Sequence, residues 1–288
     1  MGTFTNIVDA QTGTLIQHIP GADYSSSLNN AGVVASALGN GINVDFSALT
    51  YSPPAYTNST LTPESFSTCI NNAGNFVGQS WNTNAAYFWT DGNATPTTLL
   101  PYQNVASQFV HPTCVNDNQV IVGGSQLPNG GGTSSHAMYL ASPSSAPIRL
   151  NEKGADYSFA MYVTNNGKIY GTLGYNSDSS YRAVVWNTPN SVPVEIGSLA
   201  PANGIPGMYP YGANESGVIV GSDQGSTSGQ FAFGYIPGVG IFDLFAHCDS
   251  SRAGWSFANA AAINSQGWIY GAGFFNNTQH IYVAIPNS

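Results

Sequence analysis

The stretch Ile70–Ser80, which reads INNAGNFVGQS, decides the fold because close variants of it recur to the end of the chain. Each copy opens on an apolar residue, continues with Asn or Thr, and passes through a turn into a short apolar run. The six copies begin at Leu28, Ile70, Val115, Val163, Ala213 and Ile263. Intervals of 42 to 50 residues separate them, and a period of that size indicates a solenoid, a propeller or another repeat array.

Every copy predicts a strand, a tight turn and a second strand. Asn occupies the second position of five copies, with Thr164 in the other, and Gly occupies the fifth position of five copies, with Gln119 in the other. Asn tolerates a left-handed backbone and Gly adopts positive φ without steric cost, so the pair marks a hairpin turn. The run after the turn closes on Gly in five copies, Ser36 being the exception. That Gly permits another backbone to approach closely.

Most repeats continue beyond this hairpin with two further strands. Third strands are predicted at Ala85–Trp89, His136–Leu140, Arg182–Trp186, Gln230–Tyr235 and His280–Ile285. Fourth strands are predicted at Thr97–Tyr102, Ala146–Leu150, Pro193–Gly197 and Gly240–Phe245. Four short strands per repeat is the content of a propeller blade.

The two ends of the chain predict how such blades close into a ring. The sequence stops after the third strand of the last repeat, and two β-like runs, Phe4–Ala10 and Thr14–Pro20, precede the first repeat. A linear solenoid would explain neither feature, parallel β-helix repeats are much shorter, and helical repeats would need Leu, Ala, Lys and Glu. We therefore expect an all-β, six-bladed β-propeller, one domain over residues 1–288, whose last blade is completed by N-terminal strands within residues 1–20.

Composition narrows the classes of partner. Only 7% of the 288 residues are charged, and five basic against fourteen acidic side chains give a net charge of −9. That balance repels phosphate backbones and anionic membranes, so we expect no nucleic-acid partner. No apolar run approaches the ~20 residues of a membrane helix, so no membrane insertion is expected. The uncharged surface, rich in Asn, Ser and Thr, favours an extracellular or cell-surface location.

The three cysteines form neither a zinc pattern nor a dense disulfide framework. Cys69 and Cys114 occupy the same position in consecutive repeats, directly before the aligned Ile70 and Val115. They could be bridged only if their Cα atoms came within about 7 Å. The alternative is a pair of buried thiols that pack as small hydrophobes, and the sequence leaves both open. Cys248 stands apart in a polar loop.

The repeat resembles the extracellular HAF repeat of bacterial secreted proteins, in which INNxGxxVGxS is followed, after a variable loop, by an HAFLW-like strand. The copies closest to that pattern are Ile70–Trp89, Val115–Ser125 with His136–Leu140, and Ala213–Ser222 with Gln230–Leu244. The resemblance covers most of the chain from the first copy onward, and Thr164, Gln119 and Ser36 depart from it. It implies a secreted repeat protein and says almost nothing about activity.

Candidate ligand-binding residues come from the segments that enter each first strand. The position four residues before each aligned apolar residue is occupied by Tyr24, Phe66, His111, Phe159, Tyr209 and Asn259. Other aromatic residues in the incoming segments are Tyr102, Tyr157, Trp255 and Phe257. In a propeller these side chains would start near the mouth of the central channel, although they could equally pack neighbouring blades together. The predicted ligand-binding residues are Tyr24, Phe66, His111, Phe159, Tyr209 and Trp255.

Catalytic and metal-binding patterns are weak. The histidines show no metal-ligand spacing, so no metal or cofactor is expected, and the closest approach to a nucleophile elbow, Gly221–Gly225, has the wrong spacing. The acids that do not recur by repeat are expected to be solvated: Asp45, Asp91, Glu195, Asp223 and Asp243. Aromatic and Asn/Ser-rich loops favour a non-catalytic module that binds a neutral glycan or similar uncharged ligand. The alternative is a glycoside hydrolase or polysaccharide lyase with a pair of carboxylates on that face.

Overall fold

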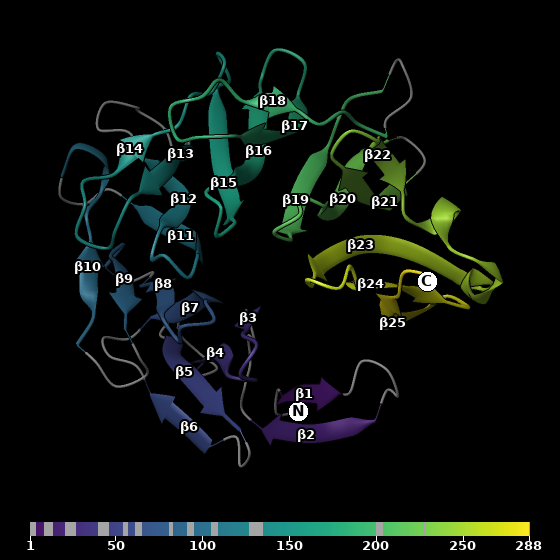
Figure 1. The fold of residues 1–288 in the computed structure, drawn as a ribbon, viewed down its shortest axis with the longest axis horizontal. Helices are drawn as coiled ribbons and strands as arrows, with labels where there is room; N and C mark the ends of the chain where they lie inside the picture. Colours follow the sequence, from purple (N-terminus) through teal and green to yellow (C-terminus); the bar gives the residue numbers. More distant parts are fainter. Residues whose placement is uncertain are drawn as a thin grey trace. The chain divides into compact units, whose positions relative to one another are not determined.

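The structure is a computed structural model. It describes residues 4–8, 14–20, 27–39, 46–53, 57–60, 65–80, 83–90, 95–104, 109–126, 135–199, 204–226 and 229–287. Over these residues the strands form six antiparallel sheets of three or four strands and a separate two-stranded sheet (Figure 1). The chain divides into two compact units, residues 1–149 and 150–288. The all-β prediction is confirmed.

The first unit carries the two-stranded sheet and three four-stranded sheets. The two-stranded sheet pairs β1 (Phe4–Val8) with β2 (Leu15–Pro20). The next two sheets are β3 (Ser27–Leu28), β4 (Val34–Gly39), β5 (Phe46–Ser52) and β6 (Thr57–Thr60), then β7 (Phe66–Ile70), β8 (Phe76–Gln79), β9 (Ala86–Trp89) and β10 (Thr97–Leu99). After the 3₁₀ turn η1 (Tyr102–Asn104) come β11 (Val110–Val115), β12 (Ile121–Gln126), β13 (Ser135–Leu140) and β14 (Ile148–Arg149).

The second unit carries three sheets, each with its strands in sequence order. The first is β15 (Tyr157–Val163), β16 (Ile169–Tyr175), β17 (Ser180–Trp186) and β18 (Val194–Glu195). The second is β19 (Met208–Ala213), β20 (Ile219–Ser226), β21 (Gly229–Ile236) and β22 (Gly240–Asp243). Two 3₁₀ turns, η2 (Phe245–His247) and η3 (Ser250–Arg252), lead to the third, β23 (Trp255–Ile263), β24 (Ile269–Phe275) and β25 (Thr278–Ala284).

Each repeat sheet has two distinct ends. At one end the first strand turns back into the second through the Asn-containing hairpin, and we call this the turn end. At the other end the first strand begins, the second strand ends and the third strand begins, and we call this the open end. In the sheet of β15–β18, for example, Val163 pairs with Ile169 at the turn end and Tyr157 pairs with Gly174 at the open end.

The turn end is built by the repeated Asn. The side-chain oxygen of Asn71 accepts from the amide of Asn75 at 2.8 Å, which closes the turn, and its Nδ2 donates to the carbonyl of Asn116 at 2.7 Å. The same pair of roles recurs from Asn29 to Asn71 and from Asn214 to Asn264. Asn suits this position because its side-chain oxygen accepts within its own turn while its nitrogen donates to the next repeat.

The fifth position of the turn adopts positive φ, as the sequence predicts. Gly74 has φ 81° and Gly217 has φ 85°, and Gln119 adopts φ 62° at the same position in the third repeat. A side chain in this left-handed region is under steric strain that Gly avoids. The hairpin prediction is therefore confirmed, and Gln119 is accommodated without a change of turn.

The Gly at the ninth position of the repeat lies within the second strand, and it allows a close backbone approach. A Cβ atom on Gly171 would lie 2.1 Å from the carbonyl oxygen of Phe159, and one on Gly221 would lie 2.0 Å from that of Tyr209. The first strands shift register at this point, between Ala160 and Tyr162 in β15. At this bulge the backbone of the first strand comes close to the Gly of the second strand. The predicted role of this Gly is confirmed.

Consecutive sheets of a unit share apolar contacts. In the second unit, Tyr170, Ala183 and Ile196 from the sheet of β15–β18 pack with Met208 and Phe233 from the sheet of β19–β22. Tyr170 and Phe233 are almost completely buried, and full burial of such a side chain stabilises the fold by roughly 1.5–3 kcal/mol. Each blade-like sheet is therefore stabilised by its sequence neighbour.

Two features of the N-terminal region differ from or extend the prediction. The first repeat also has third and fourth strands, β5 and β6, which the sequence pattern did not indicate. The strands β1 and β2 form where expected, but they pair with each other.

The sheet of β23–β25 has three strands over the described residues. A last blade completed by the N-terminal strands stays a prediction, as do the single domain and the blade count.

Candidate functional site

A row of four tyrosines lies at the open end of the second unit. The ring centroids of Tyr157 and Tyr181 are 5.5 Å apart, those of Tyr181 and Tyr209 5.0 Å, and those of Tyr209 and Tyr211 6.5 Å. Tyr157 begins β15, Tyr181 lies near the start of β17, and Tyr209 and Tyr211 come from β19. The tyrosine row therefore crosses from one sheet to the next, and all four side chains are partly exposed.

Gly174 makes room for the first ring of the tyrosine row. It pairs with Tyr157 on one side and with Tyr181 on the other, so it lies between them in the sheet. A Cβ atom at Gly174 would lie 1.8 Å from the ring of Tyr157. The ring of Tyr157 thus lies over bare backbone, and any side chain at position 174 would displace it.

Two hydroxyl groups of the tyrosine row, those of Tyr157 and Tyr209, have a raised pKa. A hydrogen bond to Tyr181 raises the pKa of Tyr157 to about 12, and burial raises the pKa of Tyr209 further above its usual range. The hydroxyl of Tyr211 accepts from Ser222 Oγ at 3.2 Å. A neutral phenol both donates and accepts, while its ring offers apolar surface. The tyrosine row can therefore bind a ligand through ring contacts and hydrogen bonds together.

A buried carboxylate anchors the chain segment that delivers Tyr209. Asp223, with 0% exposed surface, accepts from Ser198 Oγ and the Leu199 amide, both at 3.0 Å, and from the Gly207 amide at 3.3 Å. The Tyr181 amide donates to the carbonyl of Pro206 at 2.7 Å in the same segment. The expectation that Asp223 is merely solvated is wrong, because three donors replace its water shell.

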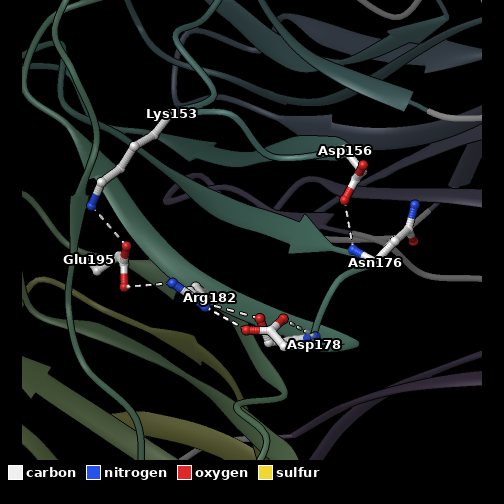
Figure 2. Close-up of polar contacts among 7 residues, drawn as sticks. Lys153, Asp156, Asn176, Asp178, Arg182 and Glu195 are labelled. Carbon is white, nitrogen blue, oxygen red and sulfur yellow. Dashed lines mark hydrogen bonds and ion pairs between the residues drawn. The ribbon is translucent and has the colours of Figure 1, made fainter.

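A network of ion pairs stiffens the outer edge of the sheet of β15–β18. Figure 2 shows Arg182 between Asp178, at 2.7 Å, and Glu195, at 3.7 Å, with Lys153 on the other oxygen of Glu195 at 2.9 Å. The guanidinium of Arg182 also lies 4.5 Å from the ring centroid of Tyr175. Exposed pairs of this kind contribute little to stability individually, but together they hold the start of β17.

The loop from β16 to β17 is restrained at both sides. Asp156 accepts from the backbone amide of Asn176 at 2.7 Å, and Asp178 accepts from that of Ser180 at 3.0 Å (Figure 2). These bonds involve charged acceptors, which are the stronger class of hydrogen bond. The loop leads into β17, in which Tyr181 directly follows Ser180. The position of Tyr181 in the tyrosine row is therefore determined by its neighbours on both sides.

The predicted ligand-binding residues are not gathered in one place. Tyr24 lies outside the described residues, and Phe66 lies in β7 with its side chain outside them. Tyr209 joins the tyrosine row, and Phe159 lies two residues after Tyr157 on β15. Trp255 belongs to a second aromatic cluster, at 5.3 Å from Phe275 and 6.0 Å from His280 between ring centroids. Whether these residues bind a ligand stays a prediction.

His111 belongs to the first unit and lies in β11 beside Phe109, with 5.8 Å between ring centroids. Burial lowers the pKa of His111 to about 4. The ring is therefore neutral at physiological pH, because burial disfavours its charged form.

Sequence reasoning missed Tyr181, Gly174 and the anchoring role of Asp223. Tyr181 precedes the predicted third strand by one residue, so an extension of that strand would have included it. Gly174 pairs with Tyr157 and Tyr181 only through the register of three strands. No local pattern marks such a position, because it depends on pairing across the sheet.

Among the residues that the structure describes, no group of three or more His, Cys, Asp or Glu side chains is placed to hold a metal ion. Over the same residues, no helix has the length and apolar character needed to cross a membrane.

Comparison with known proteins identifies the fold. The chain matches no protein-family model and no curated sequence. It is similar to the β-propeller domain of the Trilobed protease from Pyrococcus furiosus, described as having an open velcro topology, with TM-score 0.60 and 11% identity over 92% of this chain and 83% of that chain. It is also similar to TolB from Acinetobacter baumannii, with TM-score 0.50 and 12% identity over 83% of this chain and 58% of that chain.

Two peptidase chains also match over part of their length. The acylaminoacyl peptidase from Pyrococcus horikoshii matches with TM-score 0.60 and 8% identity over 91% of this chain, and a prolyl endopeptidase matches with TM-score 0.56 and 9% identity over 93% of it. This chain spans 44% and 42% of their lengths.

These likenesses establish a fold of the β-propeller type and correct the expected function. The solved structures that resemble the chain are peptidase propellers and TolB, and nothing among them indicates glycan recognition. The expectation of a glycan-binding module, with a carbohydrate-active enzyme as its alternative, is therefore wrong. Two of the residues on which it rested, Tyr209 and Trp255, lie in different aromatic clusters of the second unit.

Proposed function

We propose that this protein recognises polypeptide, and that the tyrosine row of Tyr157, Tyr181, Tyr209 and Tyr211 binds an extended peptide segment. The observation that carries the proposal is the continuity of four partly exposed rings across two sheets at one end. Tyr supplies a large rigid contact surface with little loss of side-chain entropy, together with a hydroxyl for backbone amides and carbonyls. Rings 5.0 to 6.5 Å apart suit an extended chain, whose alternate side chains lie about 6.6 Å apart on one face.

Charge near the tyrosine row favours peptides without acidic side chains. Asp156 and Asp178 lie at the same end of the sheet and are exposed, while Arg182 is neutralised by Asp178 and Glu195. The chain as a whole carries a net charge of −9. An acidic peptide would meet like charge on approach, whereas a basic one would be attracted.

The solved structures similar to the chain support a polypeptide ligand. Three of them are peptidases or a propeller domain of a protease. Fold alone does not determine function, so the proposal rests first on the tyrosine row. The likeness adds only that propellers of this type occur in proteins that act on peptides.

Selection from a random peptide display library, followed by binding of the selected soluble peptide to the full chain, tests the proposal. We expect Tyr209→Ala and Tyr181→Ala each to weaken binding by about tenfold or more, because central aromatic residues carry most of the binding energy of such a surface. Gly174→Ala should have a similar effect without removing any Tyr, since its Cβ displaces the ring of Tyr157.

Two matched substitutions serve as controls. Gly234→Ala places a Cβ 2.3 Å from the ring of Phe242, which is the same kind of clash away from the tyrosine row. Tyr139→Ala removes a partly exposed Tyr from β13 in the other unit. Both should bind the selected peptide like the wild type. Selection of no peptide, or equal losses in the controls and the tyrosine-row variants, would refute a peptide site here.

The proposal includes a ring of six blades, one for each repeat sheet, with the pair β1–β2 as the closing segment. Six repeat cores and the three described strands of the last sheet support it. Deletion of residues 1–20 should then lower the melting temperature and broaden the transition. An unchanged transition would favour an open arrangement, as described for the Trilobed protease propeller.

We also propose a cellular location for the protein and a relationship to the HAF-repeat family. The uncharged surface and the resemblance of the repeat to the HAF pattern support a secreted or cell-surface protein. Detection of the native protein in the culture medium or on the surface of intact cells, against its presence in the cytosolic fraction, tests this.

A further inference from the structure

The cysteines Cys69 and Cys114 lie on neighbouring first strands of the first unit. Both are buried, at 8% and 3% exposed, and both belong to equivalent positions of consecutive repeats. The strands β7 and β11 that carry them are tied on either side of the pair. Thr68 Oγ1 donates to the carbonyl of Pro112 at 2.7 Å, and Asn71 Nδ2 donates to that of Asn116 at 2.7 Å.

The two thiols are within reach of each other. Cys69 Sγ accepts from the amide nitrogen of Val115 at 3.4 Å. That nitrogen is two bonds, about 2.4 Å, from Cys114 Cα, so Cys69 Sγ lies within about 6 Å of Cys114 Cα. Rotation of the Cys114 side chain can turn its sulfur toward Cys69 Sγ, and a disulfide requires Cα atoms within about 7 Å.

We propose that Cys69 and Cys114 are a disulfide site that joins the first strands of two consecutive repeats when the protein matures in an oxidising environment. Both residues are free thiols in the structure. The equivalence of the two positions explains why they meet, because first strands of consecutive repeats run side by side in the same direction. This inference is independent of the proposed peptide site.

The reaction balances with a small disulfide, such as oxidised glutathione, as the oxidant. The thiolate of Cys69 attacks one sulfur of the oxidant and releases one glutathione thiolate. Cys114, after losing its proton, then attacks the mixed disulfide and releases the second, so two protein thiols are oxidised and one small disulfide is reduced to two thiols.

Burial decides when the bond forms. An oxidant cannot reach either sulfur in the folded unit, so oxidation requires folding or transient opening of β7 and β11. Once formed, the bond is shielded from reductants by the same packing. It closes a loop of 45 residues, counted from the two positions, and a loop of that length restricts the unfolded chain substantially.

The test uses the full chain and the Cys248→Ser variant, each unfolded and refolded in a glutathione buffer rich in the disulfide form and then alkylated. We expect both proteins to lose two reactive thiols and two mass units, and proteolysis to yield one peptide pair joined through Cys69 and Cys114. The oxidised form should melt about 5 °C or more above the same protein refolded under reducing conditions. Cys114→Ala and Cys69→Ala, each made in the Cys248→Ser variant, serve as single-thiol references for the alkylation count.

Three outcomes would overturn the proposal. Full alkylation of both Cys69 and Cys114 after refolding in the oxidising buffer would show that the geometry does not permit the bond. Pairing of either residue with Cys248 in the wild-type protein would assign the site elsewhere. A melting temperature lowered by oxidation would show that the bond distorts the native strands and is not a feature of the mature fold.

Discussion

The two ends of the same strands use polar side chains in different ways. At the turn end, one residue type performs one task in nearly every repeat, as when Asn71 closes its own turn and donates to Asn116. At the open end, the polar groups differ from sheet to sheet, and Ser222 and Asp223 have no counterparts at the aligned positions in most repeats. Recurrence therefore marks the scaffold, and departure from recurrence marks the candidate site.

The largest expected effect concerns the anchor of the open end. Replacing Asp223 with Ala leaves three donors without their acceptor and should lower the free energy of unfolding by about 3 kcal/mol. Urea unfolding of the full chain measures this. Asp178→Ala, which removes an exposed carboxylate from the same end, should keep a midpoint close to that of the wild type. Similar midpoints for the two variants would mean that Asp223 is not an anchor.

A second effect is the dependence of stability on pH through His111 at the open end. His111, at the open end of β11, has a folded pKa of about 4 because it is buried, against about 6.5 in an unfolded chain. A lowered pKa means that the unfolded state binds the proton first, so stability is present above pH 6.5 and is lost as the pH falls toward 4. We expect the wild type to lose about 2–3 kcal/mol through this group between pH 7 and pH 4.

The His111→Gln variant isolates that contribution. It should lack the part of the acid destabilisation that belongs to His111, as measured by urea unfolding at pH 7, 5.5 and 4 beside the wild type. His247→Gln, in the exposed 3₁₀ turn η2, serves as the control. Parallel stability curves for the wild type and His111→Gln would contradict a buried neutral His111.

A third effect tests the turn end. Asn71→Asp keeps the acceptor for the amide of Asn75 but loses the donor to Asn116 and places a carboxylate against its carbonyl. The loss should be about 2 kcal/mol. Asn30→Asp, an exposed residue in the neighbouring turn, makes the same chemical change without that contact. If both variants unfolded at the same denaturant concentration, the hydrogen bond from Asn71 to Asn116 would not stabilise the contact between these repeats.

The smallest expected effect is a gain in stability. Gln119 adopts φ 62° at a position where the other repeats have Gly, so Gln119→Gly should stabilise the protein by about 0.5–1 kcal/mol. The reverse change, Gly217→Ala at φ 85°, should destabilise it by about 1 kcal/mol. Thermal unfolding of the two variants beside the wild type measures both. A loss of stability in Gln119→Gly would show that the Gln side chain makes compensating contacts.

The sequence predicted the strands best where the pattern repeats. All third and fourth strands proposed from the later repeats are present, from β9 and β10 through β25. The strands β5 and β6 of the first repeat were missed because their sequence lacks the aromatic run seen in the later copies. Asp223 was misjudged because an isolated acid resembles a solvated one until the donors around it are known.

What the sequence determined by itself is the hairpin and its period. The hydrogen bonds of each Asn turn join residues two to four positions apart, and positive φ at the fifth position depends on one residue, so local chemistry suffices. The tertiary structure alone decided which side chains meet between strands and sheets. Tyr157, Tyr181 and Tyr209 are dozens of residues apart, and Cys69 and Cys114 are 45 apart. Their contacts depend on strand register and on the packing of one sheet against the next, which no local pattern specifies.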